Sequence, residues 1–264
     1  MKPNPEKPTQ PIRLGIISAL HQEQDGLFPF MQNPSHHEVG MRNYVQGTLW
    51  GIDCVCVLSR IGKVAAAATV ATLIERFKVS HIVFTGVAGA IGEGVRVGDV
   101  VVAESLLQHD MDASPLFPRY EVPLLGLSHF ASDTFLTENL LLAAKTFAQN
   151  DFARVIDETD RFSLQLQLPS IHHGLIASGD QFIHQRVKAE ELRAALPGLL
   201  AVEMEGAAVA QVCLEFALPF AVIRTISDGS NEKSAMDFVH FVDKVASRYA
   251  LHVIEHLCKQ LART

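Results

Sequence analysis

Carboxylate side chains follow apolar, strand-like runs at three places in the chain. Glu23 follows RLGIIS (13–18), Glu203 and Glu205 follow LLAV, and Asp228 follows AVIRTIS. Ligands of open α/β sheets bind beyond the carboxyl ends of the strands, so these acids are candidates for ligand contacts. A carboxylate beside LLAV and the small residues GAAVA is costly to bury unless a ligand or partner satisfies it, and a vicinal diol would do so.

Each acid also has a structural interpretation. Glu23 and Glu205 can each complement the positive end of a following helix, which contributes about 0.3–1 kcal/mol. Asp228 precedes Gly229 and can be an ordinary turn residue. Position alone therefore leaves both interpretations open.

Other catalytic motifs are missing from the sequence. The glycines of GVAGAIGEG (86–94) do not have GxGxxG spacing, and the run that follows them predicts a strand instead of the helix of a pyrophosphate site. IGKVAA lacks the upstream glycine and the Ser/Thr of a P-loop, and there is no GxSxG. There is no HExxH or close Cys/His set, so we expect no metal site, and Cys54 and Cys56 are predicted to be buried, reduced thiols.

The composition predicts a compact globular protein. The chain has 264 residues, 48% of them apolar and 19% charged, and a net charge of −7 with scattered basic residues. Nucleic-acid binding is disfavoured because it requires clustered cations. The N-terminus has no apolar signal region, and no apolar run reaches the ~20 residues of a membrane helix, so we expect no membrane partner and a cytoplasmic location.

Apolar β-branched runs alternate with helical patterns along the chain, which predicts a single-domain, three-layer α/β/α fold with a central mixed, largely parallel twisted sheet. We expect one catalytic domain over 12–264, preceded by a flexible arm over 1–11 with four prolines. The expected strands cover 13–18, 52–59, 80–86, 97–110, 172–180 and 219–228, with a short strand before 204. One expected helix begins at residue 20. Further helices are expected over 62–77, 137–149, 187–196, 204–218 and 238–261.

Read together, these strings resemble the 5′-methylthioadenosine/S-adenosylhomocysteine nucleosidases of the purine nucleoside phosphorylase superfamily. The resemblance covers about residues 13 to 260 and rests most on GLIASGDQFI, AVEMEGAAVAQVC and PFAVIRTISDGSN. GIISALHQE, SRIGKVAAA, FTGVAGAI with VGDVVVAE, and HD at 109–110 complete it. It implies a nucleoside phosphorylase-like fold and hydrolysis of the N-glycosidic bond of an adenine nucleoside, with release of adenine and a 5-thio-ribose, in methionine salvage.

The resemblance also implies roles for the acids. Asp228 would be the general acid that gives its proton to the purine N7, which requires a raised pKa, and Ser227 would orient it. Glu23 would position and deprotonate the attacking water, with Arg224 helping to hold both. Glu205 would accept hydrogen bonds from the ribose hydroxyls. No metal or organic cofactor is implied.

Substrate contacts follow from the same motifs. Met204 would lie against the sugar, Phe182 would stack on the adenine, and the backbone of Ile183 would bind the edge of the base. Ala88 and Gly89 would let the backbone approach closely. A further expected contact is Ile61.

The chain departs from the resembling family at three places. Val87 stands where a hydroxyl residue is common, and Arg60 where glycine is usual. The segment 109–126 is longer and richer in proline than the usual loop. In the resembling enzymes this loop reaches into the active site of a neighbouring subunit, so Leu116 and Phe117 are expected to cover the 5′ substituent in a homodimer, although an ordinary surface loop is nearly as good an interpretation.

Two alternatives to the nucleosidase stay open. Related phosphorylases bind phosphate with arginines, so Arg60 keeps phosphorolysis as an alternative. Hydrolysis of another purine nucleoside, of the futalosine type, belongs to the same alternative, although Asp228 favours amino-purines. We favour water as the nucleophile because the Glu23 carboxylate would repel phosphate and Val87 lacks a hydroxyl to hold it. A non-catalytic nucleoside-binding protein is the second alternative.

Overall fold

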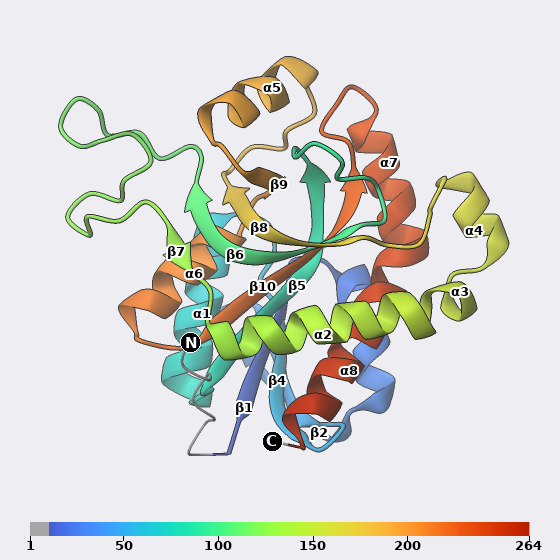
Figure 1. The fold of residues 1–264 in the computed structure, drawn as a ribbon. Coiled ribbons are helices and arrows are strands. Elements are labelled where there is room, and N and C mark those ends of the chain that lie inside the picture. The colour runs from blue at the N-terminus through green and yellow to red at the C-terminus, as the bar shows by residue number, and fades with distance from the viewer. Residues whose placement is uncertain (1–10, 264) are drawn as a thin grey trace, which may run out of the picture.

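The computed structural model describes residues 11–263, and Figure 1 shows their arrangement. Except for Pro11, the arm expected over 1–11 lies outside the described residues. No helix within 11–263 has both the length and the apolar character needed to cross a bilayer.

Ten strands of the described residues form one mixed sheet, in the order β10-β6-β8-β9-β5-β1-β4-β3-β2, with β7 paired to β6. The strands are β1 (Arg13–Ser18), β2 (Gln32–Val39), β3 (Arg42–Leu49), β4 (Ile52–Leu58), β5 (His81–Ala90), β6 (Val100–Gln108), β7 (Phe130–Ala131), β8 (Ile171–Ser178), β9 (Leu199–Glu203) and β10 (Phe220–Asp228). Parallel pairs join β1 to β4 and β5, β5 to β10, and β8 to β6 and β9. Antiparallel pairs join β10 to β6, β5 to β9, β6 to β7, and the neighbours β2, β3 and β4.

The strand β10 also pairs with β5, so β10, β6, β8, β9 and β5 close into a ring. On this ring Gly89 of β5 is in register with Asp228 of β10 and with Val202 of β9. Ser178 of β8 is in register with Glu203. The closure therefore brings the polar ends of three strands together.

Helices cover both faces of the sheet, which confirms the three-layer α/β/α prediction. On one face α1 (Lys63–Phe77) and α6 (Gly206–Glu215) pack side by side, and their small apolar residues belong to one buried cluster. On the other face α2 (Thr134–Asn150) packs against α8 (Ser247–Leu261) in a second buried cluster. The helix α5 (Arg186–Ala195) covers β8 and β9 with its buried Ala189 and Leu192. The short helices α3 (Phe152–Val155) and α4 (Glu158–Ser163) follow α2.

Three segments differ from the sequence expectations. Residues 20–30 form two 3-10 turns, His21–Glu23 and Asp25–Phe30, because Pro29 and a nearby glycine weaken an α-helix. The hairpin of β2 and β3 was not expected, since most of β2 is polar and exposed. The expected closing helix is divided into α7 (Ser234–Phe241), a π-helical turn (Val242–Ala246) and α8.

Two further expectations concern the glycine run and the cysteines. The first five residues of 86–94 continue β5 instead of forming a loop. Cys54 and Cys56 lie fully buried in β4, and both are free thiols, as predicted.

Candidate functional site

A cavity of about 340 Å³ lies at the carboxyl ends of β1, β5, β9 and β10. Both Glu23 and Asp228 line it, so the two acids face the same space. Its lining consists of Ala19, Leu20, Glu23, Ile61, Val87, Ala88, Gly89, Phe182, Val202, Glu203, Met204, Glu205, Ser227, Asp228 and Phe238. We call it the catalytic cavity below.

Glu23 is held by backbone donors at one side of this cavity. The N–H groups of Ala19 and Leu20 donate to Glu23 Oε2 at 2.8 and 2.9 Å, and the Val87 N–H donates to Oε1 at 3.0 Å. Burial raises the pKa of Glu23, while the Arg224 charge and these N–H groups oppose that shift. A fixed carboxyl with a raised pKa is suited to accept a proton from water near neutral pH.

Asp228 ends β10 and is 2% exposed. Ser227 Oγ donates to Asp228 Oδ2 at 2.9 Å, and the Ser230 N–H donates to Oδ1 at 2.9 Å. A Cβ on Gly89 would overlap Ser230 Oγ and lie 3.1 Å from Asp228 Oδ1, so glycine lets β5 approach the end of β10 closely. Burial raises the pKa of Asp228, which favours the protonated form that a general acid needs.

Glu205 lies at the start of α6 and faces the cavity from the side of β9. Its Oε1 accepts a hydrogen bond from the Gly62 N–H at 2.8 Å. Burial, followed by the nearby Glu203 charge, raises the pKa of Glu205 to about 8. The remaining acceptor capacity of this carboxyl suits the hydroxyl groups of a sugar.

Glu203, a candidate by its position after LLAV to which the resemblance gave no role, also lines the cavity. It accepts from Ser178 Oγ and from the N–H groups of Glu205 and Gly206, the latter at 2.8 Å to Oε2. Its Oε2 also lies 2.6 Å from Arg224 Nη2 in a buried ion pair. The sequence signal for Glu203 is the pair of glutamates in AVEMEG, because a spacing of two residues places both acids where β9 ends and α6 begins.

Arg224 lies behind the cavity and does not line it. Its guanidinium packs over the Phe84 ring at 3.9 Å from the centroid. A Cβ on Gly86 would lie 2.9 Å from both Arg224 Nη1 and Glu23 Oε1, so glycine lets the two side chains flank this point. Arg224 therefore supports Glu23 through its charge, while its ion pair is made with Glu203.

Apolar side chains form the other side of the cavity. Phe182, which is 40% exposed, contacts the ring of Phe238 edge-on at a centroid distance of 5.8 Å. Met204 and Ile61 line the same space, and Ile183 lines a cavity of about 30 Å³ that adjoins it. Phe238 was not expected here, because in the sequence it belongs to a long helical pattern with no distinguishing motif.

Leu116 and Phe117 do not line the catalytic cavity of their own chain. They lie in the segment between β6 and β7, which extends away from the body of the molecule (Figure 1). Leu116 is 84% exposed. Within one chain these two residues are thus separated from the other expected site residues.

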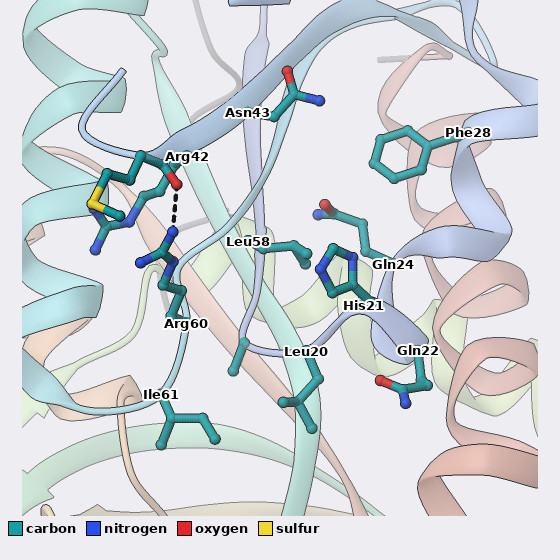
Figure 2. Close-up of a pocket in the computed structure, with 12 residues that line it drawn as sticks. Leu20, His21, Gln22, Gln24, Phe28, Arg42, Asn43, Leu58, Arg60 and Ile61 are labelled. Carbon is teal, nitrogen blue, oxygen red and sulfur yellow. Dashed lines mark hydrogen bonds between the residues drawn. The ribbon is translucent and has the colours of Figure 1, made fainter. Parts of the chain in front are cut away.

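A second cavity of about 550 Å³ adjoins the first and shares Ala19, Leu20 and Ile61 with it. Figure 2 shows this cavity, with Arg60 above Ile61. The Arg60 guanidinium donates from Nη2 to the Met41 carbonyl at 2.6 Å. Arg60 therefore lines the second cavity and not the catalytic one.

Comparison with known proteins decides the family. The phosphorylase superfamily matches residues 13–259. The 5′-methylthioadenosine/S-adenosylhomocysteine nucleosidase of Shewanella halifaxensis is 34% identical over 250 residues, 95% of this chain and 100% of that protein. The chain belongs to the methylthioadenosine/S-adenosylhomocysteine nucleosidase family. The nucleosidase from Haemophilus influenzae is also 34% identical, over 92% of this chain and 98% of its own.

Solved nucleosidase structures have the same fold. The enzyme of Neisseria meningitidis in complex with methylthio-immucillin-A has a TM-score of 0.83 and 34% identity, covering 94% of this chain and 99% of that one. The nucleosidase of Colwellia psychrerythraea in complex with adenine has a TM-score of 0.81 and 32% identity, covering 96% of each chain. Members of this nucleosidase family thus bind adenine and a nucleoside analogue on this fold.

Proposed function

We propose that the protein hydrolyses the N-glycosidic bond of 5′-methylthioadenosine and S-adenosylhomocysteine, releasing adenine and a 5-thio-ribose. The observation that carries this proposal is that Glu23 and Asp228 line one cavity whose other polar side chains include Glu203 and Glu205 and no cation. Relatives that carry these substrates in their names cover most of the chain.

On the base side, Asp228 gives its proton to the purine N7 as the bond between C1′ and N9 breaks. The bonding electron pair leaves with the purine, and a neutral adenine results. Ser227 holds the Asp228 carboxyl by its 2.9 Å hydrogen bond. Phe182 stacks on the base, and the backbone of Ile183 binds its edge.

On the sugar side, the departing base leaves an oxocarbenium-like ribose. Glu205 accepts hydrogen bonds from the ribose hydroxyls, and Met204 lies against the ring. The carboxyl groups and the polarisable sulfur stabilise the cationic transition state. Water attacks C1′ from the opposite face, and its proton goes to Glu23, so the new bond is C1′–O and the charges balance.

Water is favoured over phosphate as the nucleophile by the charge of the cavity. Four glutamate and aspartate side chains line it, and its lining includes no lysine or arginine. The Glu23 carboxylate would repel a phosphate dianion there, and no cation of the lining would offset this, since the Arg224 charge is already paired with Glu203. The Arg60 guanidinium faces the neighbouring cavity.

We further propose that the protein acts as a homodimer in the cytoplasm, in methionine salvage. The projecting segment between β6 and β7 carries exposed apolar residues, and Leu116 and Phe117 suit a cover over the 5′ substituent in a partner's cavity. The four cysteines are buried free thiols, as is typical of a reducing compartment.

A product assay tests the function. Purified protein is incubated with 5′-methylthioadenosine, S-adenosylhomocysteine and inosine, each with and without phosphate, and the products are identified. We expect adenine and a free thio-sugar from the first two nucleosides at a rate that phosphate does not change. A sugar 1-phosphate would show phosphorolysis instead, and tight adenine binding without turnover would show a binding protein.

A further inference from the structure

The second cavity has one cationic wall, and the residues of the opposite wall contact carboxylates that lie outside the lining. The Arg60 guanidinium lies on one side, and His21 and Gln22 lie on the other (Figure 2). Behind that other wall, Gln22 Nε2 donates to Asp243 Oδ1 at 3.4 Å, and His21 lies 3.9 Å from Asp25. A ligand group with a negative and a positive end would match these two walls.

Of the two guanidinium groups that line this cavity, that of Arg60 has the larger number of free hydrogen-bond donors. It donates one hydrogen bond, to the Met41 carbonyl, and no carboxylate within 11–263 forms an ion pair with it. Arg42, in contrast, donates to the carbonyls of Gly40, Ser59 and Ala65. An arginine has five N–H donors in a fork that fits a carboxylate, so Arg60 can still bind one.

The backbone at Arg60 is held in a conformation that suits glycine. Its φ is +69°, and Ser59 Oγ donates to the Arg60 carbonyl at 2.8 Å. A residue with a side chain is strained at such an angle. Nine other non-glycine residues within 11–263 also have a positive φ, so the place of the guanidinium in the second cavity, and not the backbone angle alone, points to a role for it.

Leu20 and Ile61 connect the two cavities, because both residues line each of them. A chain attached to C5′ of a ribose held by Glu205 can leave the catalytic cavity between these two apolar side chains. A methylthio group would end there. A longer amino-acid chain would continue into the second cavity, toward Arg60.

We propose that Arg60 is a specificity-determining residue that binds the carboxylate of the 5′ substituent of S-adenosylhomocysteine, with the ammonium group toward the wall of His21 and Gln22. This inference rests on the proposed function. It assigns the second cavity to zwitterionic 5′ substituents, and it accounts for arginine at a position that favours glycine.

The test compares the wild type with Arg60→Gly and Arg60→Lys on three nucleosides. These are 5′-methylthioadenosine, S-adenosylhomocysteine, and the adenosine 5′-thioether that has the aminopropyl chain without the carboxylate. We expect the ratio of kcat/KM for S-adenosylhomocysteine to that for 5′-methylthioadenosine to fall about fivefold in Arg60→Gly, the size of an exposed charge pair. Arg60→Lys keeps part of the ratio, and the ratio for the carboxylate-free thioether does not change.

Controls separate this effect from damage to the fold. Arg263→Gly removes a guanidinium outside both cavities and leaves the ratio as in the wild type. Arg60→Gly is expected to melt no lower than the wild type, because glycine relieves the strain at φ +69°. An unchanged ratio in Arg60→Gly, or an equal fall for the carboxylate-free thioether, overturns the inference.

A binding measurement keeps the inference testable if turnover fails. In the Asp228→Asn background, calorimetric titration gives the affinities for S-adenosylhomocysteine and 5′-methylthioadenosine with and without Arg60→Gly. We expect the affinity ratio to fall about fivefold on removal of Arg60. Lack of adenine release by the wild type would contradict the proposed function alone, whereas an unchanged affinity ratio would contradict the role of Arg60.

Discussion

Arg224 pairs with Glu203 and not with Glu23, although Glu23 lies just across Gly86 from it. The Nη2 to Oε2 distance in this pair is 2.6 Å, and the two side chains are 2% and 3% exposed. Glu203 thus forms the ion pair with Arg224. Glu23 instead accepts hydrogen bonds from backbone N–H groups and is influenced by the Arg224 charge from a greater distance. The division leaves Glu23 without a directly paired cation, so it can take a proton, and it leaves the lining of the catalytic cavity without a cation.

The buried ion pair predicts a large cost for its disruption. Arg224→Met leaves the Glu203 charge buried without its cation, and we expect the free energy of unfolding to fall by about 3 kcal/mol. The double variant Arg224→Met/Glu203→Gln recovers much of this, since it removes the unpaired charge. Chemical denaturation measures both. Arg248→Met, which breaks a more exposed pair to Asp160, costs less than about 1 kcal/mol; an equal loss in the two single variants would contradict the prediction.

Asp228→Asn removes the proposed proton donor. We expect kcat to fall by about 10²–10⁴, the usual contribution of a general acid, while adenine still binds. Because burial raises the pKa of Asp228, the wild-type kcat falls as the pH rises through that pKa and the acid loses its proton. The variant lacks this dependence. Adenine release followed across pH checks both points, with Asp53→Asn, a half-exposed aspartate on β4 outside the catalytic cavity, as the control. Near-normal turnover by Asp228→Asn would exclude it as the acid.

Glu23→Gln tests the proposed base. An amide cannot take a proton from water. In addition, its NH2 group would face a backbone N–H group that donates a hydrogen bond to the carboxylate in the wild type. We expect kcat to fall by about 10²–10³ with a smaller change in KM. Steady-state kinetics measures this, and Glu38→Gln, which changes an exposed acid on β2 outside both cavities, serves as the control. A variant that changes KM alone would assign Glu23 to binding.

Glu205→Gln tests the raised pKa through stability. The pKa of Glu205 is about 8 in the folded protein, against an ordinary value of 4.5 for the unfolded chain, so between these values the folded state holds a proton that the unfolded state has lost. The stability from this group is therefore present below about pH 4.5 and is lost as the pH rises toward 8. The neutral glutamine avoids this loss and keeps an acceptor for the Gly62 N–H. We expect the Tm of the variant to exceed that of the wild type at pH 9 and to match it at pH 5; a constant difference across pH would contradict the shift.

Much of the fold could be predicted because its pattern is local. Apolar β-branched runs and the period of helices such as α1 are visible residue by residue. The hairpin of β2 and β3 could not be predicted from such runs, because an edge strand such as Gln32–Val39 buries little and carries polar residues. The π-helical turn before α8 could not be predicted from the sequence either, because it leaves the apolar pattern of the helix almost unchanged.

Residues that line the catalytic cavity could be predicted where they belong to a sequence motif. Residues that only the fold brings to the cavity could not. Asp228, Glu23 and Glu205 stand after strands, and the structure places all three on one cavity. Phe238 reaches that cavity from α7, far along the chain from the motif of Phe182. The partner of Arg224 likewise depends on which strands meet, and that follows from the ring closure and not from spacing.

The closed ring also decides where this sheet is open to other chains. Strands β10, β6, β8, β9 and β5 use both of their sides within the ring, so among the described residues the long unpaired edge is that of β2. That strand contains Pro34, which has no N–H to donate, and most of its side chains are exposed and polar. Edge-to-edge association of sheets, a common route to aggregation, is therefore opposed at the long free edge of the sheet formed by residues 11–263.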